Sequence, residues 1–162
     1  MATLTVWKFN EPEGANKAVD VLEQLQKQAL IKVHDAATVT WEPDKTKPKT
    51  RQLDSLAGVG ALNGAFWGML FGLLFFVPLL GMAVGAAAGA LSGSLADVGI
   101  DDDFIASVRA KVTPGTSALF VLTSDAVLDK VYDAFQGQQA ELIYTNLSAD
   151  EDARLREVFV DA

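Results

Sequence analysis

Few residues of this sequence have the type and spacing to do chemistry. The chain holds no Cys and one His, His34, which Asp35 follows. The pair could relay a proton, but no Ser, Cys or second base is evident nearby in the sequence, so we expect a surface histidine. The run Asp101, Asp102 and Asp103 could attract Ca²⁺ or Mg²⁺, but no calcium-loop spacing follows it and acidic residues are favoured at a helix start. We predict no catalytic residue, no metal site and no cofactor, and hence no enzyme.

The charge distribution divides the chain into three parts. It carries 13 Lys and Arg against 21 Asp and Glu, a net charge of −8 that repels phosphates and argues against a nucleic-acid partner. Residues 55–96 contain no charged side chain. We therefore predict an N-terminal β-α-β half with a basic linker over residues 1–54, a glycine-zipper helical hairpin over 55–96, and a C-terminal α-β-α-β-α half over 97–162.

Regularly spaced glycines are the clearest motif of the apolar part. Two runs of four glycines, each at four-residue steps, lie on either side of Pro78, which predicts a helical hairpin with arms near 56–76 and 79–96. Each interior glycine costs a helix about 1 kcal/mol relative to alanine. A second helix that approaches closely along the glycine face would offset this cost, and Asn63 could hydrogen-bond across that contact. The predicted helix-packing and oligomer residues are Gly60, Gly64, Gly68, Gly72, Gly81, Gly85, Gly89, Gly93 and Asn63.

The length of the arms predicts insertion into a membrane. They would rise about 31 Å and about 27 Å, close to the hydrocarbon thickness of a bilayer. A hairpin that enters only part of the bilayer, or that packs inside a soluble oligomer, remains open. If the hairpin inserts, its bulky side chains face lipid or further subunits: Phe66, Met69, Leu70, Leu73 and Leu74.

A basic stretch precedes the first arm and bears on the location of the protein. Positive residues flank the cytoplasmic ends of membrane spans and attract anionic lipid. A solvated linker, kept extended by Pro43 and Pro48, explains the stretch equally well. No secretory leader precedes the first strand, so we expect both termini in the cytoplasm, at a bacterial cytoplasmic membrane. The predicted membrane-surface residues are Lys45, Lys47, Lys49 and Arg51.

The polar parts predict two β-α-β units, over residues 3–41 and 117–146. Strands are expected at 3–9, 31–41, 117–123 and 140–146, and the apolar residues of the second strand share one parity over most of its length. The first helix should bury one face made of Ala18, Val21, Leu22, Leu25 and Ala29, and the helix that starts at Asp101 should end at Pro114-Gly115. A further helix should start at Ser124-Asp125, and a capping box at Ser148–Glu151 predicts a last helix. These units favour an α+β fold, a ferredoxin-like split β-α-β domain interrupted by the apolar glycine-zipper helical hairpin, with helices on one face of a four-stranded sheet. The strand aromatics either fill the core or form a surface for subunit pairing: Trp7, Phe9, Trp41, Phe120 and Tyr144.

From Thr3 to about Phe159 the chain resembles the bacterial and archaeal family called domain of unknown function 1269. The resemblance rests on a short N-terminal strand (residues 4–7), the helix of residues 18–22, the glycine hairpin and the acidic C-terminal half. Its most specific pieces are the glycine run of residues 60–72 and the phrase Ala118-Leu119-Phe120-Val121-Leu122. The resemblance implies a membrane-associated protein and gives no catalytic residue to transfer.

Three functions remain open from the sequence. The first is a non-enzymatic homo-oligomer whose hairpins pack together in or on the membrane, with itself and lipid as partners and the α+β domains in the cytoplasm. The second is a soluble closed homo-oligomer in the cytoplasm, a ring or shell with buried hairpins. The third is a small-ligand sensing module on the sheet, anchored by the hairpin.

Overall fold

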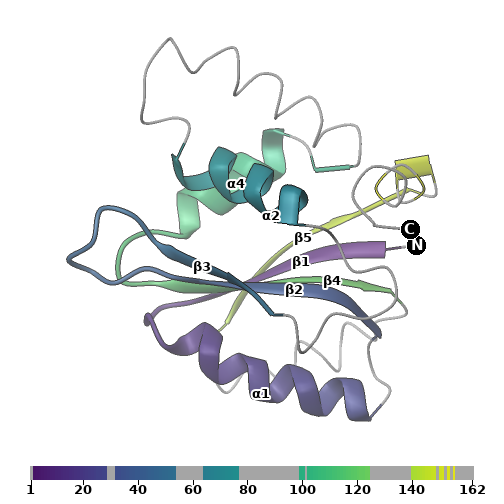
Figure 1. Ribbon diagram of the computed structural model, residues 1–162, viewed down its shortest axis with the longest axis horizontal. Coiled ribbons are helices and arrows are strands. Elements are labelled where there is room, and N and C mark those ends of the chain that lie inside the picture. The colour runs from purple at the N-terminus through teal and green to yellow at the C-terminus, as the bar shows by residue number, and fades with distance from the viewer. Residues whose placement is uncertain are drawn as a thin grey trace.

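An antiparallel sheet with helices on both faces forms this α+β protein (Figure 1). The computed structural model describes residues 2–28, 32–53, 64–76, 99–100, 102–124, 140–148, 150, 151, 153 and 155. Within them the strands are β1 (Ala2–Phe9), β2 (Lys32–Thr40), β3 (Lys49–Gln52), β4 (Ser117–Ser124) and β5 (Glu141–Asn146). The helices are α1 (Gly14–Lys27), α2 (Gly64–Phe71), the π-helix η2 (Gly72–Phe76) and α4 (Asp102–Lys111).

The strand order of the sheet is β3-β2-β4-β1-β5, and every neighbouring pair is antiparallel. Because β4 lies between β1 and β2 and is antiparallel to both, β1 and β2 run parallel to each other with α1 connecting them. The four expected strands are confirmed at these positions. The fifth strand, β3, extends the sheet beyond β2, where we had expected an extended linker.

Alternating side chains give the sheet two apolar faces. Leu4 and Val6 of β1 point to the side of α2 and α4, whereas Trp7 and Phe9 point to the side of α1, in agreement with a strand period of two. The expected apolar face of α1 is confirmed at Ala18, Leu22 and Leu25, which are buried against that second side. Burying each such leucine stabilises the fold by about 1.5–3 kcal/mol.

The expectation that helices cover one face of the sheet is wrong. Helix α1 lies on one face, and α2, η2 and α4 lie on the other (Figure 1). The strand aromatics accordingly fill the core: Trp7, Phe9 and Phe120 are buried and Trp41 is partly buried. The side chain of Tyr144 lies outside the described residues.

A β-bulge at His34 breaks the single parity that the sequence predicted for β2. The register with β4 shifts between Val33 and Asp35, so Val33 packs on the α1 side while Ala37 and Val39 pack on the α2 side. His34 and Asp35 are both buried, which corrects the expectation of a surface histidine. The extra residue thus turns a carboxylate toward the face that α2 covers.

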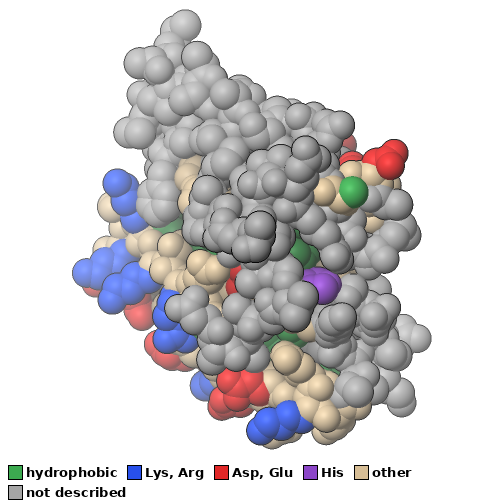
Figure 2. Space-filling model, turned by 45° about the vertical axis from the view of Figure 1, so that its right-hand side comes forward, with side chains coloured by type: hydrophobic (Ala, Val, Ile, Leu, Met, Phe, Trp, Pro, Cys, Tyr) green, Lys and Arg blue, Asp and Glu red, His purple; other side chains and the backbone are tan. Residues whose placement is uncertain are grey.

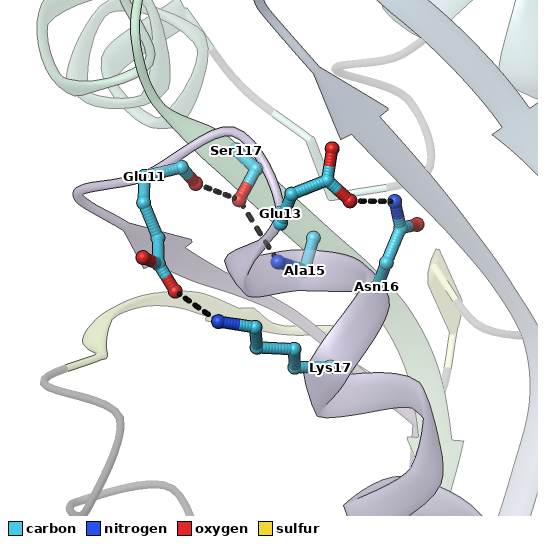
Figure 3. A network of polar contacts seen from close by, with 6 residues as sticks. All are labelled: Glu11, Glu13, Ala15, Asn16, Lys17 and Ser117. Atoms are coloured by element: carbon cyan, nitrogen blue, oxygen red, sulfur yellow. Dashed lines mark hydrogen bonds and ion pairs between the residues drawn. The ribbon is translucent and has the colours of Figure 1, made fainter.

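The start of α1 is held by a residue distant in the sequence. Its N-cap residue, Glu13, makes no capping hydrogen bond. Instead the buried Ser117 Oγ accepts a hydrogen bond from the Ala15 N–H at 2.9 Å and donates one to the Glu11 carbonyl at 2.7 Å (Figure 3). Gly14 allows this close approach, because a Cβ there would lie 2.4 Å from the Cβ of Phe9.

The ends of two later helices follow the sequence signals. At Ser148–Glu151 the capping box is confirmed: the Ser148 N–H donates to the Glu151 carboxylate at 2.8 Å, and the Glu151 N–H donates to Ser148 Oγ at 3.2 Å. Helix α4 ends before Pro114 and Gly115, as predicted, and Gly115 has a φ of +90° that favours glycine. The helix expected after Ser124 lies outside the described residues.

Candidate functional site

The apolar segment places its bulky side chains on the sheet. Phe66, Leu70 and Leu74 of α2 and η2 are buried in one cluster with strand residues such as Val6 and Phe120. The expectation that these three side chains face lipid or other subunits is therefore wrong for this structure. The side chains of Met69 and Leu73 lie outside the described residues. The described part of the first arm, residues 64–76, thus covers this face of the sheet together with α4.

Aromatic rings fix how α2 sits on the sheet. The ring of Phe71 stacks on that of Trp67 with centroids 5.6 Å apart and meets that of Phe120 edge-on at 5.2 Å. One turn later the ring of Phe75 meets that of Trp41 edge-on at 5.7 Å. Such pairs add about 0.5–1.5 kcal/mol each beyond the burial of their surface. The rings therefore hold both α2 and η2 in place.

A buried polar contact pins the same helix. Asp35 is fully buried, and its Oδ2 accepts hydrogen bonds from Trp67 Nε1 at 3.0 Å and from Gln52 Nε2 at 2.9 Å. Its Oδ1 accepts a hydrogen bond from the Ala36 N–H at 2.8 Å. A buried carboxylate is costly unless hydrogen bonds satisfy it, so this arrangement fixes the position of the indole. Asp35 thereby ties β2, β3 and α2 together.

With its bulky face on the sheet, the first arm turns glycines outward. Gly68 is exposed and Gly72 partly so, and no described atom lies within 4 Å of a Cβ built at either position. Gly64 begins α2, one four-residue step before Gly68. The other predicted packing residues lie outside the described residues: Gly60, Asn63, Gly81, Gly85, Gly89 and Gly93. We call the outward side at positions 68 and 72 the glycine face.

The predicted hairpin arms are visible only in part. Helix α2 has 8 residues and η2 has 5, and residues 56–63 of the first arm and 79–96 of the second lie outside the described residues. Among the helices that the structure describes, none has the length and apolar character needed to cross a bilayer. The described part of the chain shows no helical hairpin in the apolar segment.

The predicted membrane-surface residues lie in and beside the β2–β3 hairpin. Lys45 and Lys47 are exposed in its turn, and Lys49 and Arg51 are exposed on β3. Figure 2 shows Lys and Arg side chains along one side of the molecule with acidic side chains among them. These four residues are thus spread over a strand and a turn of the fold.

A polar cleft of about 460 Å³ opens where the start of α1 meets the edge of the sheet. Its lining combines hydroxyl groups, an amide, two cations and two carboxylates. By the register of β2 and β3, Thr38 lies opposite Arg51 and Thr40 lies opposite Lys49. The lining residues are Glu13, Asn16, Thr38, Thr40, Glu42, Lys49, Thr50 and Arg51.

Metal binding finds no support in the described part of the chain, where no group of three His, Asp or Glu residues lies close enough to hold an ion. Asp103 is exposed in the first turn of α4, and the side chains of Asp101 and Asp102 lie outside the described residues.

Comparison with known protein families identifies the family of this chain. A family model described as "Protein of unknown function (DUF1269)" matches residues 61–160. The chain belongs to this family. In this DUF1269 protein the match begins inside the apolar segment and takes in α2, α4, β4 and β5, whereas the resemblance proposed from the first 60 residues lies outside it. Neither the curated proteins nor the solved structures give a match.

Sequence reasoning missed two features of this DUF1269 protein. The first is the hydrogen bond between Trp67 and Asp35. Two unusual positions could have indicated it: Trp67 is the single Trp of the uncharged segment, and Asp35 is an acidic residue inside a predicted strand. The second is the polar cleft. No sequence pattern indicated it, because three of its lining residues lie on β3, which was not predicted.

Proposed function

We propose that this DUF1269 protein is a non-enzymatic protein that assembles with copies of itself through the glycine face. The observation that carries the proposal is the orientation of one short apolar helix. The described bulky side chains of α2 and of its continuation η2 face the sheet, while Gly68 and Gly72 face outward, and a Cβ built at either glycine meets no described atom within 4 Å. A second copy of α2 could approach this face closely enough for extensive backbone contact.

Energetics favour a packing role for these glycines. An exposed helix position that faces only water would be better occupied by alanine, which is about 1 kcal/mol more favourable than glycine. Close contact between helix backbones adds dispersion and Cα–H···O interactions that larger side chains would prevent. A helix–helix contact therefore explains why glycine rather than alanine occupies these two positions, whereas exposure to water does not.

We place the assembly at the bacterial cytoplasmic membrane, with the sheet domain and both termini in the cytoplasm. The uncharged stretch of residues 55–96 and the exposed Lys45 and Lys47 support this location, because apolar surface and basic side chains both favour an anionic lipid surface. One observation favours the alternative of a soluble closed homo-oligomer: Phe66, Leu70 and Leu74 are buried against the protein's own sheet.

For the fold we propose the ferredoxin-like class. The order β2-β4-β1-β5 supports this proposal. Strand β4 lies between the parallel strands β1 and β2, and β1 lies between the parallel strands β4 and β5, as in a split β-α-β arrangement. On this view β3 and the helices α2 and α4 are additions, one at the edge and the others on the second face.

The test replaces Gly68 and Gly72 together with leucine. Because a Cβ at either position meets no described atom and leucine favours helix, the variant should keep its fold and unfold at the same or a higher denaturant concentration. Its assembly should fall toward the single-chain mass of 17.3 kDa. Size-exclusion chromatography with light scattering, run with and without detergent, gives the mass.

The matched control is the double substitution of Ala106 and Ala110 with leucine. These residues are exposed on α4 at the same four-residue spacing, on the same side of the sheet. The control should retain the wild-type mass. A wild-type protein that is a single chain in both conditions, or a glycine variant with an unchanged mass, would contradict the proposal. An assembly that forms without detergent, and that does not float with lipid vesicles, would favour the soluble form.

A further inference from the structure

The polar cleft between α1 and the β2–β3 hairpin holds a buried hydroxyl group that has no hydrogen-bond partner in the described part of the chain. Thr38 is 3% exposed and lines this cleft. Among the buried hydroxyl side chains of the described residues, those of Thr5, Thr116, Ser117 and Thr123 all have hydrogen bonds, and that of Thr38 has none. An unsatisfied buried polar group costs about 1–3 kcal/mol. A ligand in the cleft would remove this cost.

Three of the four charged groups around Thr38 likewise have no side-chain partner among the residues that the structure describes. Neither Lys49 nor Arg51 forms an ion pair or a side-chain hydrogen bond in the described part of the chain, although both line the cleft. The same holds for Glu42. The second carboxylate, Glu13, accepts a hydrogen bond from the Asn16 amide at 3.3 Å (Figure 3). Two cations and two carboxylates therefore line one small volume, and their formal charges cancel.

This balance decides which ligand chemistry fits. A simple anion would be attracted by Lys49 and Arg51 but repelled by the two carboxylates. The start of α1 offers little extra attraction, since the N–H groups of Gly14, Ala15 and Lys17 already donate to groups of the chain. A molecule that carries both an ammonium and a carboxylate group can satisfy both sets of charges.

We propose that the cleft binds a zwitterionic amino acid with a polar, neutral side chain. Its carboxylate lies toward Lys49 and Arg51, its ammonium lies toward Glu13 and Glu42, and its side chain meets the hydroxyl of Thr38. The cleft volume of about 460 Å³ lies in the range of small-molecule sites. This site lies on the α1 side of the sheet, opposite α2, and does not depend on assembly through the glycine face.

Isothermal titration of the full-length protein with L-glutamine tests the proposal. Two blocked analogues separate the charges: N-acetyl-L-glutamine lacks the ammonium group and L-glutaminamide lacks the carboxylate. We expect L-glutamine to bind and each analogue to bind at least about tenfold more weakly, since a lost charge-assisted hydrogen bond is worth that factor. Absence of L-glutamine binding, or equal binding of either analogue, would overturn the proposal.

The variant Thr38→Val distinguishes a binding role from a structural one. Valine keeps the shape of threonine and removes the hydroxyl, so binding of L-glutamine should weaken about fivefold or more while the unfolding midpoint stays the same or rises. Lys49→Met should weaken binding by a similar factor, and Lys45→Met, in the same hairpin but outside the cleft lining, should not. Wild-type affinity in both Thr38→Val and Lys49→Met would overturn the assignment.

The Gly68 and Gly72 variant should bind L-glutamine normally, so this proposal and the proposed assembly can fail separately.

Discussion

At the scale of single residues, Asp35 has the largest structural consequence. Its carboxylate is fully buried and accepts hydrogen bonds from three groups of the described residues, one of them the indole of Trp67. Removing one partner of a buried polar contact leaves the other unsatisfied, and this penalty usually exceeds the net worth of the bond. The contact therefore fixes which face of α2 lies on the sheet and which faces outward.

We predict that Trp67→Phe lowers the free energy of unfolding by about 1–3 kcal/mol, because it keeps an aromatic ring but removes the donor to Asp35. Equilibrium denaturation by urea gives this value. The control is Trp41→Phe, whose Nε1 donates to the backbone carbonyl of Lys45 in an exposed turn at 3.0 Å, where water can replace the lost donor. If Trp67→Phe costs no more than Trp41→Phe, then Asp35 does not pin the helix.

These residue contacts were beyond what the sequence could predict. The pair Asp35 and Trp67 is separated by 32 positions and meets only because a bulge at His34 turns the carboxylate to the α2 side. One inserted residue leaves no mark in an alternation pattern, so the parity expected for β2 was wrong on one side of the bulge. Ser117, which caps α1 from a distant strand, was not predicted because it lies 102 positions from the Ala15 N–H that it binds.

At the scale of elements, local patterns predicted most of the sheet. Four strands and the apolar face of α1 follow from alternation and helical spacing, and the Ser148–Glu151 capping box follows from its sequence motif. Strand β3 was not predicted, because Lys49-Thr50-Arg51-Gln52 has no apolar residue. It is an edge strand, and its hydrogen bonds with β2 rather than side-chain burial make it a strand.

One contact between elements is sensitive to pH. Lys111, at the end of α4, hydrogen-bonds and pairs with Glu141, at the start of β5, and this hydrogen bond lowers the pKa of the Glu141 carboxyl below its ordinary value of 4.5. A pKa lowered by folding means that the pair stabilises the protein above the ordinary pKa. That stability is lost as the pH falls through the pKa of the folded state.

We predict that Lys111→Met lowers the free energy of unfolding by about 0.2–1 kcal/mol at pH 7, a small value because both side chains are largely exposed and screened. The difference from the wild type should shrink as the pH falls below about 4.5. Urea denaturation at pH 7 and at a pH below about 4.5 measures this difference. The control is Lys45→Met, which replaces a lysine that has no ion pair in the described residues. A difference that persists unchanged in acid would contradict the assignment to Glu141.

At the scale of the whole molecule, the sheet has both faces covered, and the apolar segment supplies part of one cover. The sequence indicated an apolar segment with regular glycines, but it could not tell which side of the first arm the protein itself would bury. Aromatic contacts with the sheet decide this, since they fit Trp67 and Phe71 against Phe120. The glycine face is the side that stays outward, and the proposed contact with another copy uses it.

The most direct test of assembly through this face is a disulfide between copies. The chain has no Cys, so Gly68→Cys and Gly72→Cys each introduce a single thiol. A disulfide requires Cα atoms within about 7 Å, a separation that the proposed helix contact provides. Oxidation of a mixture of the two variants should give a covalent dimer, whereas Gln24→Cys on the exposed side of α1 should stay a single chain. No dimer from the glycine-face variants, or an equal yield from Gln24→Cys, would contradict the account.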